Sequence, residues 1–394
     1  MSKTLRVLYA AGPGNVIGTY RHWVENRDDP SQVSITYSSQ FYEVCRALDA
    51  QAYVISSSKE KHFLRDGQFI FEHRPIPFRF SSGLLYHFGQ LWYGLRLIIS
   101  ALWFRSDAVV IVDGTTHWFV LSLLAAMGVR VIPSLHCVFW PKYAVPSTVE
   151  KWLFNFSRHL FTHQCTAILT ASDEISEQLI GLTGTQHLPL VLFLPTYRRT
   201  EFAEVSEPDE NRTPFRVLFA GRIESNKGVF DLLEIAKHFV TIGRHDIVFD
   251  ICGTGSAFED LQKAIKLAGI DSNFVCHGHC NKSQMREMFN QAHTVIVPTK
   301  TDFVEGFNQV VVEGVLSGRP VVTSAVCPAL SYVRDAVVEV PPDDIQEYSN
   351  ALLKLCDDRS FYEEKRRNCL TLQEQFYDPS RGWGAMLKSV LATL

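Results

Sequence analysis

The sequence has little of what marks a disulfide-bonded, secreted or nucleic-acid-binding protein. Its nine cysteines are scattered over 394 residues without the spacing of a disulfide framework, which favours a reducing compartment. Lys plus Arg number 38 and Asp plus Glu number 42, so a net charge of −4 offers no general basic surface for nucleic acid. The first residues, MSKTLRVLYAAG, lack the apolar core and cleavage site of a signal peptide. We therefore expect a cytoplasmic protein that does not bind nucleic acid.

Long uninterrupted apolar runs are also missing. The most apolar stretch, residues 84–104, contains His87, Gln90 and Arg96, whereas a membrane-spanning helix needs about 18–20 apolar residues with few or no charges. The stretch is rich in aromatic residues, and basic or titratable residues lie on or beside it: Arg74, Arg79, His87, Arg96 and Arg105. This combination suits a helix that lies on the cytoplasmic face of a membrane, and a core helix or a dimer interface is the competing interpretation.

Short β-branched runs alternate with helical patterns from end to end. Most of these runs are continuously apolar, which is typical of strands buried on both faces of a parallel sheet. In the first half we expect strands at 5–10, 53–56, 108–112, 129–135, 167–170 and 190–194, and helices at 40–49, 116–127, 148–165 and 173–182. In the second half we expect strands at 215–220, 247–252, 274–276, 295–297, 321–323 and 337–340.

The acidic segment EFAEVSEPDENRT, residues 201–213, separates the two series and reads as a linker. We therefore predict an α/β protein with two Rossmann-like, doubly wound domains that face a central cleft. The predicted parts are a first domain at 1–200, a linker at 201–214, a second domain at 215–376, and a C-terminal helix in 377–394 that packs back on the first domain. Parallel sheets bind ligands at the carboxyl ends of their strands, so we expect the site between the domains.

The segment FAGRIESNKG, residues 219–228, places two cations between a strand and a helix. Arg222 and Lys227 would add their charges to the free N–H groups and the dipole of the helix N-terminus, which together bind anions. The alternative of equal weight is a strand–loop–helix with two solvated basic residues.

A second segment, residues 301–322, carries two acids eight positions apart. We expect Glu305 in a loop, a helix that begins near Phe307 and presents the amides of Gly306 and Phe307 to an anion, and Glu313 among buried residues. A helical span would separate the carboxylates by roughly 12 Å. The paired carboxylates of glycosidases lie about 5–9.5 Å apart, so these two suit the ends of one extended ligand instead.

Taken in order, these segments resemble the nucleotide-sugar half of retaining glycosyltransferases with the GT-B fold, of the family 4, group 1 type. The resemblance is carried by Gly221-Arg222 and Lys227-Gly228, Pro298, Glu305-Gly306-Phe307 through Glu313, and the run SGRPVV at 317–322. At Asn308-Gln309 the family more often has Gly-Leu. The resemblance implies metal-independent transfer of a hexosyl group from a nucleotide-diphosphate sugar to an acceptor hydroxyl, with front-face attack and retained anomeric configuration.

The resemblance also implies roles for single residues. Arg222 and Lys227 would hold the donor diphosphate, Glu305 the sugar hydroxyls and Glu313 the ribose, and His136 would face the donor sugar. The other donor-binding residues would be Gly12 and Gly14 in the turn after the first strand, Gly221, then Gly278, His279 and Cys280 beside the base, and Gly306, Phe307, Asn308 and Gln309 along the diphosphate and sugar. About twenty residues, 20–39, are expected to separate the first glycine turn from the next helix.

No cofactor is expected besides the nucleotide-sugar substrate, and the acceptor would be a sugar or a lipid-linked molecule of polysaccharide, glycolipid or glycoconjugate biosynthesis. The motif CHGHC, residues 276–280, has metal-ligand residue types but lacks a second ligand cluster, so we predict no metal site. Two alternatives remain open: another enzyme on the same fold, such as a nucleotide-sugar epimerase or a phosphorylase, and a non-catalytic sugar-nucleotide-binding protein.

Overall fold

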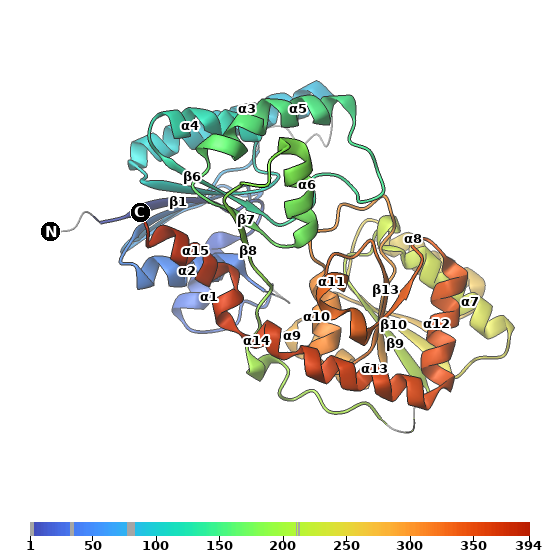
Figure 1. Ribbon diagram of the computed structural model, residues 1–394. Helices are drawn as coiled ribbons and strands as arrows, with labels where there is room; N and C mark the ends of the chain where they lie inside the picture. The colour runs from blue at the N-terminus through green and yellow to red at the C-terminus, as the bar shows by residue number, and fades with distance from the viewer. Residues whose placement is uncertain (1–3, 32–34, 77–82, 210, 212) are drawn as a thin grey trace.

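The computed structural model describes residues 4–31, 35–76, 83–209, 211 and 213–394. They form two sheets, each with helices on both faces (Figure 1). The strand order is β3-β4-β2-β1-β5-β6-β7-β8 in the first sheet and β11-β10-β9-β12-β13-β14 in the second. All strand pairs are parallel except β3 with β4. The predicted fold class, two Rossmann-like doubly wound domains, is confirmed.

The first domain contains β1 (Arg6–Ala10), α1 (Val16–Val24), α2 (Tyr37–Ala47), β2 (Gln51–Ser56), β3 (Phe63–Asp66), β4 (Phe69–His73), α3 (Gly83–Phe104), β5 (Ala108–Val112), the 3₁₀ turn η1 (Trp118–Leu121), α4 (Ser122–Ala126), β6 (Arg130–Leu135), α5 (Thr148–His159), the π-helical turn η2 (Leu160–Gln164), β7 (Ile168–Thr170), α6 (Asp173–Thr183) and β8 (Leu190–Leu192). A 3₁₀ turn, η3 (Arg199–Glu201), leads into the connection to the second domain.

The second domain contains β9 (Phe215–Ala220), η4 (Ser225–Lys227), α7 (Val229–Thr241), β10 (Ile247–Cys252), α8 (Phe258–Ala268), β11 (Phe274–Gly278), α9 (Lys282–Gln291), β12 (Thr294–Val297), α10 (Gln309–Leu316), β13 (Val321–Ser324), α11 (Leu330–Val333), η5 (Arg334–Ala336), β14 (Val337–Val340), α12 (Ile345–Asp357), α13 (Arg359–Leu372) and α14 (Glu374–Tyr377). The chain ends in η6 (Pro379–Arg381) and α15 (Trp383–Leu391).

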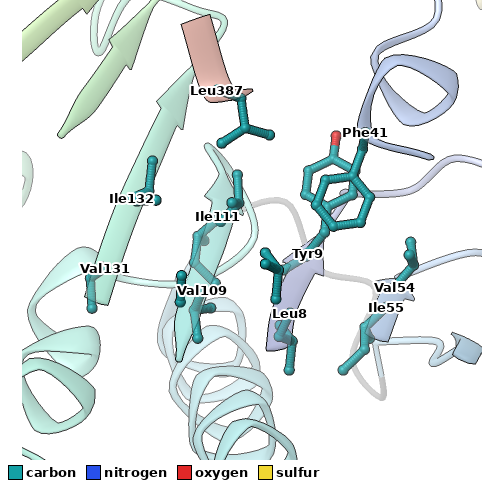
Figure 2. Close-up of a cluster of buried hydrophobic side chains, with 14 of the residues drawn as sticks. Leu8, Tyr9, Phe41, Val54, Ile55, Val109, Ile111, Val131, Ile132 and Leu387 are labelled. Atoms are coloured by element: carbon teal, nitrogen blue, oxygen red, sulfur yellow. The ribbon is translucent and has the colours of Figure 1, made fainter. Parts of the chain in front are cut away.

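The core of the first domain explains why its strands are continuously apolar. Leu8 and Tyr9 of β1 point to opposite faces of the sheet, and both are buried because helices cover both faces. Figure 2 shows these residues among their neighbours on β2, β5 and β6, with Leu387 of α15 packed near Ile111. The chain therefore returns from the second domain, and α15 packs on α2 of the first.

Two expectations for the first domain are wrong, and one element was missed. The helix α1 follows the glycine turn directly, so residues 20–39 do not form a long connection, although 32–34 lie outside the described residues. The side chain of Asn15 caps α1 by accepting from the Gly18 amide at 2.9 Å, and this cap offsets a segment rich in poor helix formers. The hairpin β3–β4 was not expected, although Gly67 has the left-handed φ of +53° that such tight turns use. The helix expected at 116–127 is divided into η1 and α4.

The apolar stretch 84–104 forms α3, which is buried along one face and exposed along the other. No helix in the described ranges is both long and apolar enough to cross a bilayer. Of the basic residues beside the stretch, Arg74 does not reach the surface, because it is 5% exposed and pairs with Glu72 at 2.7 Å. Arg79 lies outside the described residues.

The two domains touch along the carboxyl edges of their sheets. Tyr332 of α11 donates a hydrogen bond to Asp173 at the start of α6 at 2.7 Å, and Figure 1 shows these two helices facing each other between the domains. Lys282 at the start of α9 pairs with Asp28 at 3.2 Å. These contacts hold the carboxyl ends of both sheets opposite each other, as expected for an interdomain site.

Candidate functional site

An ion pair between Lys227 and Glu305 forms the centre of the candidate site. Lys227 ends η4 and Glu305 lies in the loop before α10, and their Nζ and Oε2 atoms are 2.6 Å apart. Their side chains are only 14% and 11% exposed. The Gly306 amide and the Asn308 side-chain amide donate to the same carboxylate at 3.2 and 3.1 Å. Four residues from two loops are thus held in one network.

The position of Lys227 depends on the glycine that follows it. Gly228 has a φ of +78°, and a Cβ atom there would lie 2.1 Å from the carbonyl oxygen of Pro298. Only glycine allows this approach, so the Lys227-Gly228 turn packs directly on the end of β12. The motif residues Lys227, Gly228 and Pro298 therefore belong to one packing unit beside Glu305.

Arg222 lies on the solvent side of this network. Its side chain is 63% exposed and pairs with Glu224 at 2.9 Å. The ring of Phe303 joins the two cations, because its centroid lies 3.7 Å from Lys227 Nζ and 5.6 Å from Arg222 Cζ. Sequence reasoning did not single out Phe303, since an aromatic residue in a loop gives no signal of its own.

The loop after β6 of the first domain packs against Glu305 and Gly306. A Cβ atom on Gly306 would lie 1.8 Å from the carbonyl oxygen of His136, so a side chain cannot be accommodated there. The Val138 amide donates to the Glu305 carbonyl at 3.4 Å. His136 was predicted on this loop, and the structure brings its backbone to the edge of the Lys227–Glu305 network.

The imidazole of His136 is half-buried, and its desolvation lowers its pKa to about 4. It is therefore neutral at physiological pH. Its Nε2 lies 2.9 Å from the hydroxyl of Ser134, which also accepts a hydrogen bond from Trp383 Nε1 at 2.8 Å. The ring of Tyr37 packs on it at 4.4 Å between centroids. The C-terminal helix thus braces the histidine through Ser134, a connection that the sequence does not reveal.

Asp113 is a carboxylate beside the site that sequence reasoning missed. It directly follows β5 and accepts a hydrogen bond from the Cys137 amide at 2.8 Å. Burial raises its pKa to about 6, although backbone amides that donate to it act in the opposite direction. Desolvation, together with the charges of Asp113 and Glu305, raises the pKa of the neighbouring Cys137 thiol, whereas Lys227 and Arg222 act in the opposite direction. Charged groups of both domains therefore lie close to this loop.

Glu313 is buried on α10, as expected, with 8% of its surface exposed. Tyr197, which precedes the linker, donates a hydrogen bond to its Oε1 at 3.2 Å. Tyr197 is itself buried, so the pair is shielded from bulk water. Sequence reasoning did not find Tyr197, because 116 residues separate the two positions.

The helix expected from about Phe307 begins two residues later, at Gln309. Gly306 and Phe307 therefore precede the helix, where the Gly306 amide donates to Glu305 and the buried Phe307 ring packs 5.4 Å from that of Tyr332. Asn308 has a φ of +70°, which glycine and asparagine adopt more readily than other residues. This conformation explains why Asn can replace the Gly that is usual in the resembled family. The Gln309 side chain reaches across the interface to Tyr37 at 3.3 Å.

The remaining predicted residues lie at the carboxyl edges of the sheets. Their positions are the turn between β1 and α1 for Gly12 and Gly14, the end of β9 for Gly221, and the end of β11 and the turn after it for Gly278, His279 and Cys280. A Cβ atom on Gly12, Gly14 or Gly278 would meet nothing within 4 Å, so the space in front of them is open. Within the described ranges, no hydrogen bond joins these residues to Lys227 or Glu305.

The residues of the CHGHC motif have other partners in the structure. His277 Nε2 lies 2.8 Å from Asp250, and Cys280 is buried. Nowhere in the part of the chain that the structure describes do three or more His, Cys, Asp or Glu side chains gather as a metal ion would require.

Comparison with known proteins places the second half in a recognised family. Residues 201–371 match the family described as glycosyl transferases group 1. An alpha-D-kanosaminyltransferase of Streptomyces kanamyceticus is 29% identical over 166 residues, which are 42% of this chain and 42% of that protein. A D-inositol 3-phosphate glycosyltransferase of Arthrobacter sp. (strain FB24) is 30% identical over 141 residues, 35% of this chain and 32% of that protein. The matched parts thus span less than half of both relatives.

The fold is shared over a greater length than the sequence. The crystal structure of Anabaena HepE in complex with UDP matches with a TM-score of 0.69 at 13% identity. The match covers 99% of this chain and 100% of HepE. The likeness therefore extends through both domains, although at this identity it concerns the fold alone.

Proposed function

The chain belongs to the group 1 glycosyltransferases with the GT-B fold, and on this premise we propose that it transfers a hexosyl group from a nucleotide-diphosphate sugar to an acceptor hydroxyl. The transfer retains the anomeric configuration and needs no divalent metal. The acceptor is a sugar or a lipid-linked molecule in polysaccharide, glycolipid or glycoconjugate biosynthesis, and the reaction takes place in the cytoplasm. UDP in the HepE structure supports a nucleotide-sugar donor.

The observation that carries this proposal is the Lys227–Glu305 pair at the interface between the domains. A cation for a leaving diphosphate and a carboxylate for sugar hydroxyls are held 2.6 Å apart, with Arg222 linked to them through Phe303. The loop that carries His136 packs on the same pair from the other domain. The arrangement suits a donor whose diphosphate and sugar lie side by side between the domains.

In the proposed reaction, the bond between the anomeric carbon and the diphosphate oxygen breaks as the acceptor oxygen bonds to the same face of the sugar. Negative charge develops on the diphosphate, where Lys227 and Arg222 stabilise it. The acceptor proton passes to the departing diphosphate, so no residue of the chain needs to act as a covalent nucleophile. When the donor binds, its diphosphate competes with Glu305 for Lys227 and so frees that carboxylate to accept hydrogen bonds from sugar hydroxyls.

The other residues would bind the ends of the donor. Glu313 accepts hydrogen bonds from the ribose, in an orientation that Tyr197 supports at 3.2 Å. Neutral His136 can exchange a hydrogen bond with a sugar hydroxyl without adding a charge. The turn at 278–280 lies against the base, and the turn at Gly12 and Gly14 lies beside the acceptor and phosphate.

A panel of nucleotide-diphosphate sugars tests the proposal. A donor at a hundred times its Kd adds about 2.7 kcal/mol of stability, which raises the melting temperature by several degrees. Donors found in this way are then assayed for release of the nucleoside diphosphate by the wild type and by Lys227→Ala. The matched control is Lys237→Ala, because Lys237 is exposed in a pair with Glu234. Binding without release would favour the non-catalytic alternative, and a changed sugar on an intact nucleotide would favour the epimerase.

A further inference from the structure

Exposed apolar side chains are concentrated on one part of the first domain. Among the described residues, 23 large hydrophobic side chains are exposed, and 15 of them lie between Leu84 and Phe156. Single exposed apolar residues are common on protein surfaces, but a contiguous group of this size marks an interaction surface.

The helix α3 shows this most clearly because its two faces differ. Tyr93, Leu97 and Ala101 on one face are at most 1% exposed and pack in the core. On the opposite face, Ile99 and Trp103 are 66% and 68% exposed. The core interpretation of residues 84–104 therefore explains only half of the helix.

The exposed surface extends from α3 to α5 through a line of rings. His87 of α3 stacks on His117 with 5.1 Å between centroids, and His117 stacks on Phe119 of η1 at 5.9 Å. Phe119 lies 6.0 Å from Phe156 of α5, which lies 6.3 Å from Trp152. Figure 1 shows α3, α4 and α5 together on the outer side of the first sheet. We call this surface the docking face and define it by Leu84, Trp92, Ile99, Trp103, Trp152 and Phe156.

Basic residues accompany the rings of the docking face, and two of them pair with acids from outside residues 83–164. This range contains six Lys and Arg against three Asp and Glu, of which Lys142 pairs with Glu174 at 2.7 Å and Arg96 lies 4.0 Å from Glu72. Lys151 and Arg158 are exposed on α5, the helix that also carries Trp152 and Phe156. Each of the three acids already accepts a hydrogen bond within the protein. Asp107 accepts from the Arg6 amide, Asp113 accepts from the Cys137 amide, and Glu150 accepts from the Ser147 amide in the cap of α5.

From these observations we infer that the docking face binds the surface of an anionic lipid bilayer. Exposed Trp and Phe side chains beside Lys and Arg suit the boundary between headgroups and acyl chains, where rings insert and cations meet lipid phosphates. The same ring line reaches His117, four residues beyond Asp113 at the carboxyl edge of β5. Docking would therefore bring the first-domain side of the site to the membrane. This inference rests on the proposed function, and it assigns a lipid-linked molecule as the acceptor.

A second copy of the chain is a poorer occupant of this face. In a two-fold dimer the same surface is present on both partners, so both would bring the same cations to the interface. An anionic bilayer instead complements both the apolar rings and the positive charge. The choice between these occupants can be measured.

The test is flotation of the full chain with vesicles of phosphatidylcholine containing 30% phosphatidylglycerol, and with vesicles of phosphatidylcholine alone. We expect binding to the anionic vesicles that weakens at high salt. Trp92→Ser/Trp152→Ser should abolish it, whereas the matched control Ile242→Ser/Leu267→Ser, at exposed sites of the second domain, should bind like the wild type. Circular dichroism checks that each variant is folded.

A charge pair of variants gives a second, independent readout. Each cation near an anionic surface contributes about a fivefold change in affinity, so Lys151→Gln/Arg158→Gln should weaken binding about 30-fold. Lys237→Gln/Lys263→Gln, at exposed positions of the second domain, should leave it unchanged.

Three outcomes would overturn the inference. They are a wild type that stays with the unbound fraction, equal loss of binding in the control variants, and a stable dimer that Trp92→Ser/Trp152→Ser converts to a monomer without any vesicle binding. Turnover of the donor in lipid-free solution is measured in parallel. Because that reaction needs no docking, failure of vesicle binding and failure of the proposed transferase are distinguishable.

Discussion

Removal of the Lys227 ammonium should affect stability and catalysis by different amounts, and both follow from one contact. In Lys227→Ala, Glu305, whose side chain is 11% exposed in the intact pair, loses its partner at 2.6 Å. Breaking a buried pair by removing one partner costs about 3–5 kcal/mol, but the Gly306 and Asn308 donors remain, so we expect a loss of about 2–3 kcal/mol. For catalysis, loss of one group that stabilises developing charge should lower kcat/KM at least 100-fold.

A double-mutant cycle separates the two effects. Glu305→Gln removes the charge that Lys227→Ala leaves unpaired, so the double variant should regain about 2 kcal/mol of the lost stability but none of the activity. Urea unfolding is best followed by circular dichroism, because all seven tryptophans lie outside residues 201–376. A Lys227→Ala variant as stable as the wild type, or a cycle with no coupling, would refute the reasoning about this pair.

Three further perturbations test other parts of the site. Glu313→Ala should weaken binding of the free nucleoside diphosphate at least tenfold and Tyr197→Phe about fivefold, as about 1 kcal/mol per hydrogen bond implies, and unchanged affinities in calorimetry would contradict the ribose role. Burial raises the pKa of Asp113 from about 4 to about 6, so between these pH values the native state binds more protons than the unfolded state. Wild-type stability should therefore fall as pH rises through this window, by up to about 3 kcal/mol relative to Asp113→Asn, and pH-independent differences in urea unfolding would contradict this. Gly306→Ala should separate the domains locally, because its Cβ atom would lie 1.8 Å from the His136 carbonyl oxygen. We expect at least a tenfold loss of donor turnover, measured as release of the nucleoside diphosphate.

The sheet architecture could be predicted because buried parallel strands are continuously apolar. The expected bounds of β9, β10 and β14 match the structure, since each run is flanked by turn residues and packed between helices. The failures have local causes. The helix α1 contains Gly18 and β-branched residues, so its propensity is poor, and its Asn15 cap and core packing decide the outcome. The hairpin β3–β4 carried a readable signal in Asp66-Gly67.

The site was predictable where its residues are adjacent in sequence. Arg222, Lys227, Glu305 and Glu313 lie in two short segments with recognisable spacing. The supporting residues come from elsewhere: Tyr197 approaches Glu313 from the segment before the linker, and Trp383 reaches His136 through Ser134 from the other end of the chain. Such contacts depend on tertiary structure, and one sequence contains no pattern for them. Asp113 was recoverable in principle, because an acid followed by glycine ends the apolar run of β5.

The stereochemistry of donor hydrolysis tests the central claim most directly. In the absence of an acceptor, water slowly takes the acceptor's place, so no knowledge of the natural acceptor is required. Proton NMR, recorded as the reaction starts, identifies the anomer of the released sugar before it equilibrates. The account predicts that the first-formed sugar has the anomeric configuration of the donor and that Lys227→Ala releases it at least 100 times more slowly. Release of the opposite anomer, or equal rates in the two proteins, would contradict it.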